Sequence, residues 1–310
     1  MDRPLRITFC CTDTKAEPWL AGLRAALPGA TVELWQPGAP QADHAVVWAP
    51  PQQFMDEQAA LRGIFNIGAG VDALMKLRLP ASATVVRLDD AGMSVQMAEY
   101  VCHALIRHFR ELDGYEADVA QGKWSYRKPR LRSEWPVGIM GLGVLGARVA
   151  QAVAGFEFPV NGWSRSAKTL PGVRGFAGAE QFDDFLRASK VLVCLLPLTP
   201  DTRDILNRRT LSLLQPGGYL INVARGAHVV DDDLIALIDE GHLAGATLDV
   251  FRTEPLPAGH AFWRHAKITV TPHTSARTLR DESVAQIAGK IVALERGEPI
   301  AGVVDRGRGY

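Results

Sequence analysis

Short hydrophobic runs alternate with helical patterns along almost the whole of this 310-residue chain. Alternation of this kind is typical of βαβ units, which build parallel sheets covered by helices. The strand-like runs are residues 5–10, 45–48, 64–67, 84–88, 137–140, 158–163, 191–196, 219–224, 246–251 and 268–272. Because domains usually contain ~100–200 residues, the sequence predicts an α/β protein with two Rossmann-like parallel-sheet domains, one flavodoxin-like and one dinucleotide-binding.

Two long helical patterns, at about residues 94–119 and 278–294, are expected to carry the chain between these domains. We expect a discontinuous substrate-binding and catalytic domain formed by residues 1–96 and 277–310. The dinucleotide-binding domain would then be formed by residues 97–276. The active-site cleft would lie between the two domains, where ligand sites commonly form.

The composition excludes several classes of partner. The 34 Lys and Arg residues balance the 34 Asp and Glu residues, which argues against nucleic acid or an anionic membrane surface. No apolar run approaches the ~18 residues of a membrane span, and the N-terminus lacks the pattern of a signal peptide, so a cytoplasmic location is expected. The four cysteines, Cys10, Cys11, Cys102 and Cys194, form no CxxC pair. We expect buried, reduced thiols rather than disulfides or zinc ligands, and no metal site.

Residues 121–133 are both basic and aromatic, and they include Trp124, Tyr126 and Arg127. Nucleic-acid patches share this composition. The balanced charge of the chain instead favours an arm that lies over the active-site cleft or at a subunit interface.

Gly141, Gly143 and Gly146 form a GxGxxG pattern between a strand-like run and a helical pattern. In a Rossmann turn the first glycine allows the tight bend, the second lets the backbone approach a pyrophosphate, and the third lets the helix pack on the strand. The helix that follows would offer backbone N–H groups and the positive end of its dipole to phosphate. This context favours dinucleotide binding over an ordinary glycine turn.

The next strand-like run leads into Ser164, Arg165, Ser166 and Lys168, where an NAD site usually has an acidic residue. A carboxylate would repel the 2′-phosphate of NADP, whereas hydroxyls and cations bind it. The sequence therefore predicts NADP(H) as the preferred cofactor. The alternative is a solvated loop, with the acidic residue elsewhere.

Arg225, Glu254 and His273 follow three successive strand-like runs. Because ligands sit beyond the carboxyl ends of parallel strands, these side chains are expected to meet at one edge of the sheet. Taken singly, each is more often a surface or structural residue. Together they suit reduction of a 2-oxo acid: Arg225 would bind the carboxylate, His273 would protonate the carbonyl oxygen, and Glu254 would orient the imidazole and favour its charged form.

Gly68, Ala69 and Gly70 follow a strand-like run of the first domain and would present backbone N–H groups to a carboxylate. A plain tight turn is the alternative. Trp48 ends another run and is expected to wall the substrate pocket with Met93, although a core tryptophan fits the sequence equally well. A pocket closed in this way would favour short substrates.

The chain resembles the D-isomer-specific 2-hydroxyacid dehydrogenases, and among them the bacterial NADPH-dependent glyoxylate/hydroxypyruvate reductases of the A type. The resemblance covers nearly the whole chain and is carried by residues 66–72, 138–146, 163–166, 294–299 and 304–310. It implies a homodimeric enzyme in which Arg225, Glu254 and His273 are catalytic. Thr274 is a mild departure, because many relatives have a small or apolar residue there.

The resemblance also implies the cofactor contacts. Asp249 would face the nicotinamide carboxamide, and Pro197 and Thr202 would cover the cofactor ribose. The full expected set is Gly141, Leu142, Gly143, Val144, Leu145, Gly146, Trp163, Ser164, Arg165, Ser166, Lys168, Leu196, Pro197, Leu198, Thr202, Val223, Ala224, Arg225, Asp249 and His273.

The predicted function is NADPH-dependent reduction of a small 2-oxo acid, glyoxylate to glycolate or hydroxypyruvate to glycerate, with His273 as the proton donor. One alternative is an NAD-linked D-2-hydroxyacid dehydrogenase of another substrate. A second, from a different class, is a dinucleotide-gated corepressor, for which the sequence offers no added recognition segment. Turnover of a 2-oxo acid would separate the enzyme from the corepressor.

Overall fold

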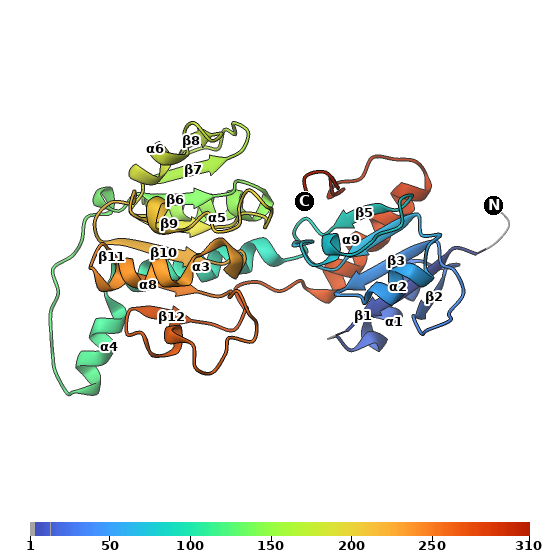
Figure 1. The fold of residues 1–310 in the computed structure, drawn as a ribbon, viewed down its shortest axis with the longest axis horizontal. Helices are drawn as coiled ribbons and strands as arrows, with labels where there is room; N and C mark the ends of the chain where they lie inside the picture. Colours follow the sequence, from blue (N-terminus) through green and yellow to red (C-terminus); the bar gives the residue numbers. More distant parts are fainter. Residues whose placement is uncertain (1–3, 13) are drawn as a thin grey trace. The chain divides into compact units, whose positions relative to one another are not determined.

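The computed structural model describes residues 4–12 and 14–310. The chain divides into two compact units, one containing residues up to Met93 and from Arg277 onward, and the other containing residues 94–276. In Figure 1 the first unit combines the blue start and the red end of the chain, and the second unit takes the colours between them.

The first unit has a five-stranded parallel sheet in the order β2-β1-β3-β4-β5. Its strands are β1 (Arg6–Cys11), β2 (Thr31–Leu34), β3 (His44–Trp48), β4 (Gly63–Asn66) and β5 (Thr84–Arg87). Its helices are α1 (Ala16–Ala26), α2 (Gln52–Glu57), η1 (Leu74–Lys76) and α9 (Arg280–Glu295). The strand order is that of flavodoxin-like folds, as predicted.

The hydrophobic runs of the sequence form the buried inner strands of the first unit. The inner strands of a parallel sheet are covered on both faces, so they contain few polar residues. Phe9 of β1 and Phe54 of α2 are completely buried. Helix α9 matches the helix predicted at residues 278–294, packs against α1 and buries Val284 and Ile287.

The second unit has a seven-stranded parallel sheet in the order β12-β11-β10-β9-β6-β7-β8. Its strands are β6 (Val137–Met140), β7 (Val160–Ser164), β8 (Val173–Ala177), β9 (Val191–Cys194), β10 (Gly218–Asn222), β11 (Leu243–Leu248) and β12 (Ile268–Val270). Its helices are α3 (Met93–Phe109), α4 (Leu112–Ala120), η2 (Arg132–Glu134), α5 (Val144–Gly155), α6 (Phe182–Arg187), α7 (Arg208–Leu211), η3 (Gly226–His228), α8 (Asp231–Asp239) and η4 (Ala261–Arg264). Counted from β6, this is the dinucleotide-binding strand order with β12 added at one edge, which confirms the predicted fold class.

The single helix predicted over residues 94–119 is wrong, because the structure has two helices there. Helix α3 ends at Phe109 and α4 begins at Leu112, and Glu111 between them has a left-handed backbone with φ of 53°. The apolar face of α3 also ends at Phe109, and α4 buries no residue. Helices are held mainly by burial of one face, so nothing extends α3 beyond this point.

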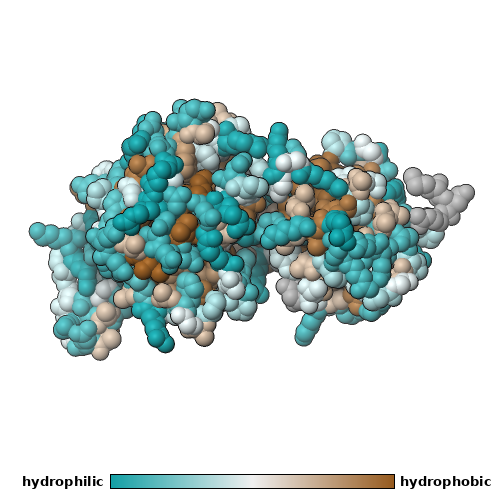
Figure 2. Space-filling model, viewed as in Figure 1, coloured by the Kyte–Doolittle hydropathy of each residue, from teal (hydrophilic) through white to brown (hydrophobic). Residues whose placement is uncertain are grey.

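Figure 2 shows that hydrophilic residues cover most of the visible face of each unit. Among the described residues, no helix is long and apolar enough to cross a membrane. Cys10, Cys102 and Cys194 are buried, Cys11 is half-buried, and none of these four described residues forms a disulfide. The described part of the chain also contains no group of three or more His, Cys, Asp or Glu residues placed to hold a metal ion.

Candidate active site

The predicted catalytic residues lie at one edge of the sheet in the second unit. Strand β10 neighbours β11, and β11 neighbours β12. Arg225 follows β10, Glu254 follows β11 and His273 follows β12. Because all three strands run in the same direction, their carboxyl ends bring these side chains to the same edge.

Glu254 and His273 are joined by a hydrogen bond. The Nδ1 atom of His273 lies 2.7 Å from Oε2 of Glu254. The other carboxylate oxygen, Oε1, accepts a hydrogen bond from the backbone N–H of Phe251 at 2.8 Å. The carboxylate is therefore fixed by its own turn, and it fixes the orientation of the imidazole ring.

The pKa of Glu254 is lowered from its ordinary value. Partial burial would raise the pKa, but hydrogen bonds from His273 and the Phe251 backbone outweigh burial, and the charges of His273 and Arg225 act in the same direction. The group is therefore a carboxylate over most of the pH range, and as a carboxylate it accepts the hydrogen bond from Nδ1 of His273.

The turn that carries Arg225 is held by its neighbours. The Nδ2 atom of Asn222 donates to the carbonyl oxygen of Arg225 at 3.0 Å, and Oδ1 of Asn222 accepts from the backbone N–H of Ala224 at 3.1 Å. A Cβ atom added to Gly226 would overlap the backbone of Phe251. The turn after β10 thus packs backbone to backbone on the segment that leads to Glu254.

Asp249 holds the loop that contains His273. Its side chain is completely buried. One oxygen accepts from Thr271 Oγ1 at 2.6 Å and from the backbone N–H of Thr274 at 2.8 Å, and the other accepts from the backbone N–H of Ser275 at 2.8 Å. In the structure this carboxylate supports the loop, and the predicted contact with a nicotinamide carboxamide stays a prediction.

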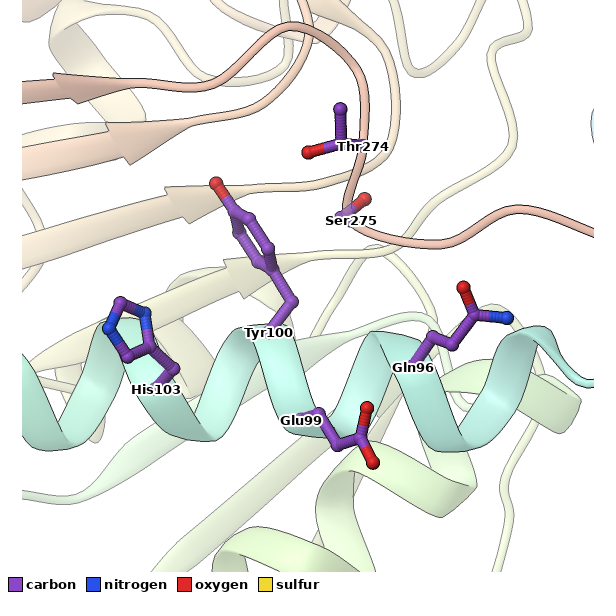
Figure 3. A pocket seen from close by; sticks show the side chains of 6 residues that line it. All are labelled: Gln96, Glu99, Tyr100, His103, Thr274 and Ser275. Carbon is purple, nitrogen blue, oxygen red and sulfur yellow. The ribbon is translucent and has the colours of Figure 1, made fainter.

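A polar pocket of about 340 Å³ lies beside this loop. It is lined by Gln96, Glu99, Tyr100, His103, Thr274 and Ser275. In Figure 3 the ring of Tyr100 rises from α3 on the side of Thr274 and Ser275. The Tyr100 hydroxyl lies 2.5 Å from Oγ1 of Thr271, and burial raises the pKa of Tyr100 to about 12. Since Thr271 donates to Asp249, the neutral Tyr100 hydroxyl donates to Thr271.

The predicted glycine turn has the geometry of a dinucleotide site. Gly141 has φ of 99°, in the left-handed region that favours glycine. A Cβ on Gly146 would overlap the carbonyl oxygen of Gly141, whereas a Cβ on Gly143 would meet no atom within 4 Å. The side chains that share this turn differ in exposure: Leu142 is buried, Leu145 is half-buried and Val144 is exposed.

The side chains at the end of β7 and in the loop that follows it are only partly exposed to solvent. Trp163 packs on Phe182 with ring centroids 4.8 Å apart, and its Nε1 donates to the carbonyl oxygen of Gly178 at 2.8 Å. Ser164 is buried and its hydroxyl donates to the carbonyl oxygen of Ser166 at 2.8 Å. Arg165, Ser166 and Lys168 are exposed.

The Nζ atom of Lys168 donates to the carbonyl oxygen of Leu142 at 2.8 Å. This bond joins the two loops predicted to hold the nucleotide. Leu142 also packs against the backbone of Gly162, where a Cβ would lie 2.7 Å from the Leu142 side chain. The sequence pattern selected both loops but did not predict their connection.

The remaining predicted cofactor residues lie at the ends of β9 and β10. Leu196, Val223 and Ala224 are buried. Pro197 and Leu198 are half-buried. Thr202 is held inside its own turn, since its hydroxyl donates to the carbonyl oxygen of Pro197 at 2.7 Å.

Two of the predicted substrate features of the first unit lie at strand ends: Trp48 is the last residue of β3, and residues 68–70 follow β4. Gly68 lies directly on the ring of Trp48, and an added Cβ would overlap that ring. Asn66 Nδ2 donates to the carbonyl oxygens of Gly68 and Gly70, at 2.9 and 3.0 Å. The structure therefore brings Trp48 and the loop of residues 68–70 together. Met93, at the start of α3, is buried, and its contact with substrate stays a prediction.

Sequence reasoning missed the polar residues that support these loops. They are Asn66, Tyr100, Asn222, His228 and Thr271. Four of them lie close in sequence to a residue that was selected, which is the signal that would have found them. Tyr100 gives no such signal, because only the fold brings α3 beside β12.

Comparison with known proteins defines the class to which this fold and site belong. The family model "D-isomer specific 2-hydroxyacid dehydrogenase, NAD binding domain" matches residues 102–275. A glyoxylate/hydroxypyruvate reductase A of Serratia proteamaculans is 48% identical and covers 99% of this chain and 100% of that protein. A reductase of the same name from Yersinia enterocolitica is 44% identical with the same coverage. The chain belongs to the D-isomer-specific 2-hydroxyacid dehydrogenase family, as its sequence predicts.

Solved structures agree with this assignment. A D-isomer-specific 2-hydroxyacid dehydrogenase from Xanthobacter autotrophicus Py2, in complex with NADPH and MES, has a TM-score of 0.94 and 39% identity, covering 99% of this chain and 100% of that one. An NADPH-dependent glyoxylate/hydroxypyruvate reductase from Sinorhizobium meliloti, in complex with NADP and sulfate, has a TM-score of 0.93 and 33% identity with the same coverage.

Proposed function

We propose that the protein is an NADPH-dependent 2-hydroxyacid dehydrogenase that reduces small 2-oxo acids, glyoxylate to glycolate and hydroxypyruvate to glycerate. The observation that carries this proposal is the 2.7 Å hydrogen bond between His273 and Glu254, at the sheet edge where Arg225 follows the neighbouring strand β10. These groups supply a proton donor, an anion that orients it and a cation for a carboxylate. The names of the relatives support the same reaction.

The second unit is assigned to cofactor binding. The open backbone at Gly143 fits the close approach of a pyrophosphate. Helix α5, of 12 residues, starts at this turn and directs its first N–H groups toward that position. When bound, the reduced nicotinamide supplies the hydride. Asp249 and the turn of Pro197 and Thr202 are assigned to its carboxamide and ribose, on the family resemblance.

NADP(H) is preferred over NAD(H) because of the loop after β7. Arg165, Ser166 and Lys168 are exposed there, and residues 164–168 contain no acidic side chain. Cations and hydroxyls bind the 2′-phosphate, whereas a carboxylate would bind the ribose hydroxyls of NAD. The bond of Lys168 to Leu142 holds this loop against the glycine turn.

The catalytic residues act on the 2-oxo acid in defined roles. Arg225 forks onto the substrate carboxylate. Since Nδ1 of His273 contacts Glu254, Nε2 is the nitrogen that hydrogen-bonds the substrate carbonyl oxygen. The carbonyl oxygen takes the Nε2 proton as negative charge develops on it, and the product is the 2-hydroxy acid. Glu254 stabilises the imidazolium before the transfer.

The first unit is assigned to substrate binding. The loop of residues 68–70 presents backbone N–H groups to the substrate carboxylate. Trp48 packs on Gly68 at the base of this loop, and we assign Trp48 and Met93 to the wall of the pocket. A large ring at this place favours short substrates.

The arm, residues 121–133, is assigned to a subunit interface. Two of its five basic residues form ion pairs within the same unit: Arg127 pairs with Asp118 at 2.7 Å, and Arg130 pairs with Glu111 at 3.1 Å. These two charges are therefore compensated locally, which weakens the case for a phosphate backbone as the partner.

The aromatic and apolar residues of the arm point outward. Trp124 is fully exposed, and Tyr126 and Leu131 are 81% and 63% exposed. Exposed apolar groups on a segment that ion pairs hold in place are typical of a protein–protein interface. We assign them to a second copy of this chain, in a cytoplasmic homodimer. Light scattering of the wild type and of a Trp124→Ser, Tyr126→Ser variant tests this, and a wild-type monomer would contradict it.

The function is tested by assaying glyoxylate, hydroxypyruvate and longer 2-oxo acids with NADPH and with NADH. We expect turnover of the short acids, fastest with NADPH. Preference for NAD+ and oxidation of another D-2-hydroxy acid would favour the NAD-linked alternative. Tight NADPH binding without turnover of any 2-oxo acid would favour the corepressor.

A further inference from the structure

A buried imidazole, His228, lies behind the turn of Arg225 and has no part in the proposed proton transfer. It is the last residue of η3, which directly follows Arg225. Its side chain is completely buried. The ring nitrogens of a buried imidazole need hydrogen-bond partners within the protein. The partners of His228 therefore show which segments of the chain it connects.

The Nδ1 atom of His228 contacts the turn after β10. It lies 3.0 Å from the carbonyl oxygen of Arg225 and 3.3 Å from the backbone nitrogen of the same residue. The carbonyl oxygen also accepts from Asn222 Nδ2 at 3.0 Å. The backbone of Arg225 is thus held by two side chains at once.

The Nε2 atom of His228 contacts a different turn, the one after β9. It lies 3.3 Å from the carbonyl oxygen of Pro197. The same oxygen accepts a hydrogen bond from the hydroxyl of Thr202, so both His228 and Thr202 contact it. One ring therefore joins the turn assigned to the cofactor ribose with the turn that presents Arg225.

The pKa of His228 reflects the hydrogen-bond acceptors around its ring. Burial lowers the pKa of His228, but the Cys194 side chain and the carbonyl oxygens of Pro197 and Arg225 together raise it above its ordinary value. A protonated imidazole donates from both nitrogens, to the carbonyl oxygens of Arg225 and Pro197. The neutral ring with its proton on Nε2 donates to Pro197 and accepts the backbone N–H of Arg225 on Nδ1, so both forms join the two turns.

We propose that His228 is a positioning residue. It fixes the position of the Arg225 turn relative to the Pro197 turn, so that substrate binding and cofactor binding both depend on this one buried ring. This inference rests on the proposed function, because it uses the assigned roles of both turns. Gly226 fixes the other side of the Arg225 turn against Phe251. His228 is thus a side chain that contacts both turns and that can be replaced without entering the backbone contact at Gly226.

Two amide variants separate the two halves of the ring. The side-chain amide of asparagine replaces the Nδ1 side, and that of glutamine reaches the Nε2 side. His228→Asn should keep the dissociation constant for oxalate within about twofold and raise that for NADPH about tenfold, as expected for one lost bond to a buried acceptor. His228→Gln should show the opposite pattern. Oxalate, added to the NADPH complex, probes Arg225 without being reduced.

Fluorescence titration of NADPH and oxalate gives both constants without turnover, so the test stands even if no 2-oxo acid is reduced. His108→Asn is the matched control. His108 is also a histidine of the second unit that is largely removed from solvent, but its ring stacks on Tyr219 of β10. This control should leave both constants unchanged. Unchanged constants in both His228 variants, or equal losses of both ligands in each, would overturn the proposal. Absence of turnover in the wild type would instead overturn the proposed function.

Discussion

The backbone N–H of His273 donates to the carbonyl oxygen of Asp249 at 2.8 Å, so the backbone of the proposed proton donor is joined directly to the backbone of a buried aspartate. The side chain of Asp249 also binds the residues that follow His273. His273 has a left-handed backbone with φ of 54°, a conformation that costs a non-glycine residue on the order of 1–3 kcal/mol. Asp249 supplies the bonds that maintain it.

Replacement of His273 by glutamine should lower kcat for reduction by about 10²–10⁴-fold, the usual contribution of a general acid. The dissociation constant for NADPH should change little, because the ring acts on the substrate oxygen. Stopped-flow reduction and fluorescence titration measure the two quantities. A variant that retained half of the wild-type kcat would require another proton donor.

Arg225→Lys should raise KM for the 2-oxo acid about tenfold or more and also lower kcat. Lysine keeps the charge but loses the planar fork that fits a carboxylate, and charge-assisted bonds are worth ~1.5–3 kcal/mol. NADPH binding serves as the control and should be unaffected. Unchanged steady-state constants would leave the loop of residues 68–70 as the carboxylate site.

Glu254→Gln should move the alkaline limb of kcat/KM for reduction to lower pH. The lowered pKa of Glu254 keeps it charged, and this negative charge favours the imidazolium that must donate the proton. The neutral amide removes that effect, so reduction should fail earlier as pH rises. A pH profile from 5 to 10, as an approximate range around the histidine titration, measures the limb, and an unmoved limb would contradict the coupling.

The same shift predicts how stability depends on pH. A carboxyl group whose pKa is lowered by folding stabilises the folded state above the ordinary value, here 4.5, and loses this effect as pH falls through the lowered value. Urea unfolding of the wild type and of Glu254→Gln should therefore differ at neutral pH and converge below that window. A constant difference at all pH values would exclude ionisation as its cause.

Arg165→Ala should weaken NADPH binding roughly ten- to a hundredfold, the loss expected for one charge-assisted bond. NADH binding should change little, because NADH has no 2′-phosphate. Adding Ser164→Asp should reverse the preference, since a carboxylate accepts the ribose hydroxyls of NADH. Equal losses for the two cofactors in Arg165→Ala would show that Arg165 does not contact the phosphate.

Gly226→Ala should destabilise the second unit by about 3 kcal/mol or more, beyond ordinary overpacking, because the added Cβ overlaps the Phe251 backbone. Gly155→Ala is the matched control. A Cβ there meets no atom within 4 Å, and Gly155 lies in α5, where alanine is favoured by up to about 1 kcal/mol. Urea unfolding should separate the two variants clearly.

The fold was largely predictable because buried strands are hydrophobic along their whole length. The two strands that the pattern missed, β2 and β8, both lie at a sheet edge. Each is partly exposed, so neither forms a continuous apolar run. The break at Glu111 was missed for a related reason, since helix-forming residues continue there while burial ends.

The site was predictable where chemistry and strand position coincide, as for Arg225, Glu254 and His273. Exposure was less predictable: Trp163 was selected as a cofactor contact, and its ring packs on Phe182 inside the unit. Supporting bonds such as that of Tyr100 to Thr271 depend on tertiary placement. A sequence pattern does not contain that information.

Gly226 and Phe251 meet backbone to backbone, with no side chain between the turn of Arg225 and the segment that leads to Glu254. The spacing between Arg225 and the pair of Glu254 and His273 is therefore set at this point by the path of the backbone and not by the size of an intervening side chain. Directed evolution toward bulkier substrates should consequently find few useful changes at these strand ends. Its productive substitutions should fall instead at Trp48, the side chain that we assign to the wall of the substrate pocket.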